Sequence, residues 1–226
     1  MINGLGNIGN KFNADGSIRF FPGNTILSFI NHDSVAWKGF QVIRNMLLSC
    51  EASRCMTMLP DSSIHMTVIE GVCHDWRFPE SWTKYLPIDC RLEETDLLFE
   101  KAFKTVKPLG NVNMRMDHVD LDYGSSIRLA PATEADVQEL KRFRDDCSAA
   151  LGVRLPNHDW YEFHVSICYF TKQPTLAEEE ELLAYVEHAN EYLSSKQIIF
   201  PLEPAQLTYF NDMGEFKPER FDRNGL

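Results

Sequence analysis

The chain has 226 residues, of which 44% are hydrophobic, so it is long enough to bury a substantial core, and its composition argues against a disordered protein. Its formal net charge of −11 argues against a long basic groove for duplex nucleic acid, because affinity for that polyanion comes largely from Lys and Arg. A small ligand or the end of a nucleic-acid strand remains open as a partner.

No segment approaches the roughly 20 apolar residues that span a bilayer. The N-terminal region, with Asn3, Gly4, Asn7 and Asn10, lacks the apolar middle of a signal peptide. We therefore expect a cytoplasmic protein with no membrane partner. We also expect a monomer.

The cysteines form no C-x-x-C pair and do not cluster with histidines at the spacing of zinc ligands. We expect reduced thiols and no metal site. The six are Cys50, Cys55, Cys73, Cys90, Cys147 and Cys168.

The first half of the chain is predicted to alternate strands and helices, from the spacing of its apolar residues and from turn signals such as Phe21-Pro22-Gly23. In chain order, we expect a strand over 23–30, a helix over 34–48, a strand over 64–72, a loop over 76–87 and a helix over 96–106.

The second half is predicted to continue this alternation. Thr133 with Asp136, and Thr175 with Glu178, have the spacing of helix N-terminal capping boxes. In chain order, we expect a strand over 114–123, a hairpin turn at Gly124, a strand over 127–129, a helix over 133–152, a strand at 163–167, a helix over 175–195 and a strand over 206–210. No low-complexity linker divides the chain, so residues 1–226 are predicted to form one domain.

Two strand segments closely repeat each other: Ile64-His65-Met66-Thr67-Val68 and Phe163-His164-Val165-Ser166-Ile167. Side chains in a strand point alternately to opposite faces, so each segment presents one imidazole and one hydroxyl on the same face. If the two strands lie side by side, they form a site with two histidines and two hydroxyls. Such a site suits acid–base chemistry on a phosphate.

A cyclic phosphodiester needs a base that activates water, an acid that protonates the leaving oxygen, and donors for the non-bridging oxygens. A histidine pair can supply base and acid near neutral pH without a metal. We predict that His65 and His164 are catalytic and that Thr67 and Ser166 bind the phosphate. The sequence leaves open which histidine is the base.

Each motif residue also has a structural interpretation. A single histidine is most often a hydrogen-bonded core residue, and Thr favours strands regardless of function. Cys168 shares the predicted face of His164 and Ser166, although a small buried filler is the simpler interpretation. The aromatic side chains near the second motif could stack on a nucleobase or simply pack in the core; they are Trp160, Tyr161 and Tyr169.

The motifs His65-Met66-Thr67-Val68 and His164-Val165-Ser166-Ile167, about a hundred residues apart, resemble those of the 2H phosphoesterase superfamily, which includes RNA 2′,3′-cyclic phosphodiesterases. The segments Lys11-Phe12-Asn13-Ala14-Asp15-Gly16 and Phe21-Pro22-Gly23-Asn24-Thr25 resemble a little-characterised microbial and fungal branch. The resemblance implies a mixed α/β (α+β) fold with two lobes, pseudo-twofold symmetry and antiparallel sheets that line a central cleft, with the motifs facing each other on adjacent sheets.

The expected function is that of a metal-independent phosphodiesterase, a hydrolase without cofactor, that acts on a 2′,3′-cyclic phosphate or a related nucleotide or RNA phosphodiester. Two alternatives remain: a non-catalytic nucleotide-binding or sensing module that uses the same cleft, and a metalloprotein in which the histidines are ligands. The exact substrate and the pathway are not determined by the sequence.

Overall fold

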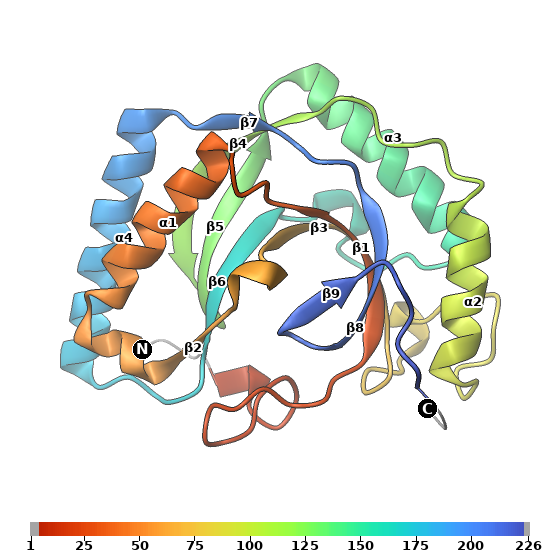
Figure 1. Cartoon of the computed structure of the whole chain (residues 1–226), viewed down its shortest axis with the longest axis horizontal. Helices are drawn as coiled ribbons and strands as arrows, with labels where there is room; N and C mark the ends of the chain where they lie inside the picture. Colours follow the sequence, from red (N-terminus) through yellow and green to blue (C-terminus); the bar gives the residue numbers. More distant parts are fainter. Residues whose placement is uncertain (1–4, 224–226) are drawn as a thin grey trace.

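The computed structural model describes residues 5–223 (Figure 1). Its helices are α1 (Val35–Leu48), α2 (Leu92–Phe103), α3 (Glu134–Leu151) and α4 (Leu176–Lys196). Its strands are β1 (Gly23–Phe29), β2 (Met56–Met58), β3 (His65–Cys73), β4 (Asn113–Leu121), β5 (Gly124–Pro131), β6 (His164–Phe170), β7 (Ile199–Pro201), β8 (Gln206–Asp212) and β9 (Glu215–Lys217). Short 3₁₀ turns cover Leu5–Asn7, Glu51–Cys55, Asp61–Ser63, Pro79–Ser81 and His158–Trp160.

The strands form one antiparallel sheet in the order β7-β4-β5-β6-β3-β1-β8-β9, with β2 also paired to β6. The two strands that carry the histidine motifs, β3 and β6, are therefore neighbours at its centre. They meet through the pair Met66 and Val165. The sequence predicts two adjacent sheets, but the structure has one continuous sheet, because the narrow seam between β3 and β6 joins the two lobes.

The sheet order reads the same from both sides of that seam. The first half of the chain contributes β1, α1, β3, α2 and β4, and the second half contributes β5, α3, β6, α4 and β8 in the same sequence. Each half places its last strand on the other lobe, since β4 pairs with β5 and β8 pairs with β1. The predicted pseudo-twofold arrangement of two lobes is confirmed.

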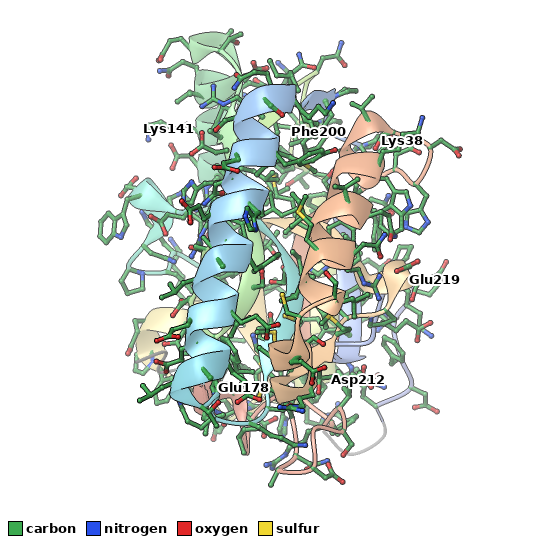
Figure 2. All side chains as sticks on the ribbon, turned by 90° about the vertical axis from the view of Figure 1, so that its left-hand side faces the viewer. Lys38, Lys141, Glu178, Phe200, Asp212 and Glu219 are labelled. Atoms are coloured by element: carbon green, nitrogen blue, oxygen red, sulfur yellow. The ribbon has the colours of Figure 1, made fainter. Side chains whose placement is uncertain are left out.

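The helices lie in pairs on the outer sides of the curled sheet (Figure 1). Helices α1 and α4 run side by side and cover β4 and β7 (Figure 2), and α2 and α3 cover β8 and β3. No helix within residues 5–223 is long and apolar enough to cross a membrane. The helices thus leave the inner, concave side of the sheet for the site.

N-terminal capping marks where three of the helices begin. Thr133 with Asp136, and Thr175 with Glu178, form the predicted capping boxes. The helix predicted over 96–106 instead begins at Leu92, because the Glu94 carboxylate accepts a hydrogen bond from the Arg91 backbone at its N-terminus.

The sequence does not predict three of the strands: β2, β7 and β9. Each has only three residues, which is too few to show the alternation that identifies a strand in sequence. The six cysteines all lie within the described residues and are all free thiols, as predicted.

Candidate active site

All four predicted site residues line one cavity of about 200 Å³ between the lobes. The antiparallel pairing of Met66 with Val165 explains how they meet. One step along each strand from this pair, His65 comes opposite Ser166 and Thr67 comes opposite His164. Side chains opposite each other on one face have Cβ atoms about 5 Å apart. Each imidazole therefore lies beside the hydroxyl of the other motif.

Both imidazoles are held by the same local contact. Nδ1 of His65 lies 2.6 Å from the carbonyl oxygen of Ser63, and Nδ1 of His164 lies 2.9 Å from that of Glu162. A carbonyl oxygen only accepts hydrogen bonds, so Nδ1 carries the proton in both rings. Nε2 is then the nitrogen that can take up or release a proton in the cavity.

Burial lowers the pKa of both histidines. The pKa of His65 falls from 6.5 to about 4, mainly because the ring is desolvated, and the charges of His164 and Lys11 lower it further. Desolvation also lowers the pKa of His164, although the nearby Asp120 opposes the shift. Both rings are therefore neutral in the free protein at pH 7.

His65 has more aromatic neighbours than His164. The ring centroids of Phe216 and Phe29 lie 4.4 Å and 6.4 Å from that of the His65 imidazole. His164 has one such neighbour, Tyr161, at 6.3 Å. The two histidines thus have the same backbone setting and different side-chain surroundings.

A β-bulge follows the first motif and changes which residues of β3 face the cavity. Ile26 pairs with Ile69 while the next residue, Leu27, pairs with Thr67, so β3 contains one extra residue at this point. Strict alternation would turn Ile69 toward the site, but it is buried in the core. Glu70 lines the cavity instead.

The second motif is followed by a matching bulge. Ser125 pairs with Cys168 while Ser126 pairs with Ser166. Cys168 is consequently turned into the core, with its Sγ 3.2 Å from Sδ of Met56, as expected for a buried filler, and it does not line the cavity of the four motif residues. Tyr169 lines the cavity in its place. Glu70 and Tyr169 occupy equivalent positions in the two lobes.

The other predicted aromatic candidates have different positions. Tyr161 lines the cavity, and burial raises the pKa of its hydroxyl. Trp160 is 69% exposed and lies outside the cavity. Of the five other histidines in the sequence, none lines it; they are His32, His74, His118, His158 and His188.

Lys11, from the loop that precedes β1, also lines this cavity. Its Nζ lies 5.1 Å from the ring centroid of Tyr169, 5.5 Å from that of Trp76 and 5.9 Å from that of Phe21. Sequence reasoning did not identify Lys11 or Glu70 as site residues. No local pattern links them to the histidine motifs.

A larger cavity, of about 680 Å³, adjoins this site at Tyr161 and contains neither motif histidine. It includes Asp145, His158 and Asp159, whose ligand atoms lie within 4.8 Å of one another. These groups already form ion pairs, because Arg154 lies 3.0 Å from Asp145 and 2.7 Å from Asp159. The smaller cavity, which is lined by both motif histidines and both hydroxyls, is therefore the candidate active site.

Comparison with known proteins identifies the family of the chain. A family model described as 2H-phosphodiest, domain of unknown function (DUF1868), matches residues 11–123, which is half of the chain and includes the His65 motif. No curated protein matches the chain. The crystal structure of a conserved protein of unknown function, ATU0111 from Agrobacterium tumefaciens strain C58, has a TM-score of 0.86 and 26% sequence identity, over 93% of this chain and 90% of that one. This likeness extends over both lobes.

Proposed function

This chain belongs to the 2H phosphodiesterase family, and we propose that it is a metal-independent phosphodiesterase that hydrolyses a 2′,3′-cyclic phosphate or a related nucleotide phosphodiester. One observation carries the proposal. His65 and His164 have their Nδ1 protons fixed by backbone carbonyls and lie in one cavity with two hydroxyls.

The surroundings of the two rings suggest their roles. His65, with the lower pKa, is the base: its Nε2 removes a proton from water as the water oxygen bonds to phosphorus. His164 is the acid: its Nε2 gives a proton to the ribose oxygen as the bond from phosphorus to that oxygen breaks. The ring that holds a proton more easily is thereby the proton donor. The products are a phosphomonoester and a free ribose hydroxyl.

The hydroxyls of Thr67 and Ser166 are proposed to donate hydrogen bonds to the non-bridging phosphate oxygens. Each lies opposite the histidine of the other motif, so a phosphate between the rings is within reach of both. Hydrogen bonds to developing negative charge stabilise the transition state more than the ground state. The histidines thus make both proton transfers, and the hydroxyls bind the phosphate oxygens.

The lining of the cavity supports a nucleotide as the substrate. Besides the motif residues it contains the rings of Phe21, Trp76 and Tyr169, and aromatic faces are suited to stacking on a base. The cavity of about 200 Å³ is small, and the net charge of −11 disfavours a long nucleic acid. We therefore propose a small nucleotide or the end of an RNA strand as the substrate.

The test is hydrolysis of a panel of 2′,3′-cyclic nucleotides, 2′-5′ dinucleotides, 3′,5′-cyclic nucleotides and cyclic dinucleotides, with EDTA present. The wild type is compared with His65→Ala, His164→Ala and, as a control, His118→Ala, which changes an exposed histidine outside the cavity. We expect turnover by the wild type and by His118→Ala, and none by His65→Ala or His164→Ala. Binding of these compounds without turnover by the wild type would favour a nucleotide-binding module instead.

A further inference from the structure

We propose that Lys11 binds the phosphate of the substrate and neutralises the charge that develops on it, a role that rests on the proposed function. The residue lies far from both histidine motifs in the sequence and belongs to neither lobe of the sheet. Its loop nevertheless places its ammonium group in the cavity of the two histidines.

Lys11 is the only Lys or Arg among the described residues that line this cavity. The neighbouring cations are already engaged. The guanidinium of Arg128 contacts Asp120 at 2.5 Å and Glu162 at 3.5 Å. The buried guanidinium of Arg144 donates hydrogen bonds to backbone carbonyls. Lys11 forms no salt bridge within residues 5–223, although the Glu70 carboxyl in the same cavity is stabilised by its charge, so the N–H groups of Lys11 are available to a ligand.

The loop holds Lys11 by contacts that leave its ammonium hydrogens free. The Lys11 backbone donates to the carbonyl of Asn7 at 3.0 Å and accepts from the amide of Arg19 at 2.9 Å. Next to it, Phe12 is fully buried against Tyr169. The Lys11 ammonium group lies 5.1 to 5.9 Å from the centroids of neighbouring aromatic rings, whose faces attract it. This cation–π attraction does not occupy its N–H groups with a hydrogen-bond acceptor.

The charge that develops in the reaction calls for a second cation. In the proposed reactive form the histidine pair carries one positive charge, on His164, and Glu70, the carboxyl that lines the cavity, can only add negative charge. A phosphodiester brings one negative charge, and a second develops as water adds. Preorganised positive charge in a desolvated site is an effective way to stabilise that change.

The first experiment is a titration with inorganic phosphate, monitored by calorimetry, of the wild type, Lys11→Met, Lys11→Arg and Lys38→Met. Lys38 is an exposed residue of α1 and serves as the control (Figure 2). We expect Lys11→Met to weaken phosphate binding at least tenfold, Lys11→Arg to retain most of it, and the control to match the wild type. Equal affinities in Lys11→Met and the wild type, or no binding by the wild type, would overturn the proposal.

The second experiment measures turnover on the substrate found with the panel. We expect Lys11→Met to lower kcat/KM by about 10²- to 10³-fold, with partial rescue of Lys11→Ala by added ethylammonium. If His65→Ala and His164→Ala abolish turnover while Lys11→Met keeps it, the role of Lys11 is wrong and the proposed function stands. If the histidine variants keep turnover, the proposed function fails, and the phosphate titration still decides whether Lys11 binds the anion.

Discussion

The Nδ1–H groups of His65 and His164 donate hydrogen bonds to the carbonyl oxygens of Ser63 and Glu162. In each case the acceptor belongs to the residue two positions earlier in the chain. The two lobes thus orient their histidines by the same backbone contact. A histidine at the start of a strand is oriented by the backbone that leads into it, and its Nε2 is left for chemistry.

Removal of either imidazole should abolish most of the activity. A positioned acid or base contributes about 10²- to 10⁴-fold, so His65→Ala and His164→Ala are each expected to lower kcat by that factor. The double variant should be little worse than the weaker single variant, because the two residues act in one reaction step. Initial rates with the panel substrates check this, and strictly additive losses would contradict it.

The pH dependence of kcat/KM should be bell-shaped and acidic. The reactive form has a neutral His65 and a protonated His164, so it is populated above the pKa of His65, about 4, and is lost as pH rises through the pKa of His164, which lies below 6.5. The charges that face the pair are Lys11, Glu70, Asp120 and Arg128.

Rates measured from pH 4 to 8 check this profile. Lys11→Met should move the alkaline limb to higher pH, because the Lys11 charge lowers the pKa of both histidines. An alkaline limb above pH 7 in the wild type would contradict the assignment of His164 as the acid.

Loss of the motif hydroxyls should reduce catalysis without unfolding the protein. Thr67→Val and Ser166→Ala each remove one hydrogen bond to a charged oxygen, which is worth about 1.5–3 kcal/mol, or roughly 10- to 150-fold in kcat/KM. Thr67→Ser should retain activity, because it keeps the hydroxyl. Thermal unfolding of each variant shows whether a loss has a structural cause.

Replacement of Glu70 should strengthen anion binding. Its side chain lines the cavity, and burial raises the pKa of its carboxyl, while the charge of Lys11 opposes that shift. Glu70→Gln removes negative charge near the phosphate, so we expect inorganic phosphate to bind about three- to tenfold more tightly. The exposed Glu219→Gln serves as the control in the same titration, and weaker binding to Glu70→Gln would contradict the charge argument (Figure 2).

A buried ion pair ties the C-terminal segment to the first lobe. The Arg223 guanidinium lies 2.7 Å from a carboxylate oxygen of Asp96, and it also donates to the carbonyls of Gly23 and Phe210. Arg223→Met would leave Asp96 buried without its cation, which costs about 3–5 kcal/mol of unfolding free energy. Urea unfolding should show this loss.

Arg220→Met is the matched control for that measurement. Arg220 is more exposed and lies 3.4 Å from Glu100, so its loss should cost about 1 kcal/mol or less. Equal effects of the two substitutions would contradict the importance of the buried pair.

The sequence alone determined the local features of the protein. Alternation placed each histidine on the same side of its strand as a hydroxyl, and the capping pairs at Thr133 and Thr175 marked the beginnings of two helices. These features depend on neighbouring residues only, so period and side-chain chemistry are sufficient to predict them.

Only the tertiary structure decided how those pieces combine. The pairing of Met66 with Val165 brings the motifs together, and the two bulges turn Glu70 and Tyr169 into the cavity in place of Ile69 and Cys168. A bulge depends on the partner strand and leaves no mark in the hydrophobic pattern. The N-terminal loop likewise reaches the site only after folding, because two of the rings that its lysine contacts, Trp76 and Tyr169, come from segments distant in the sequence.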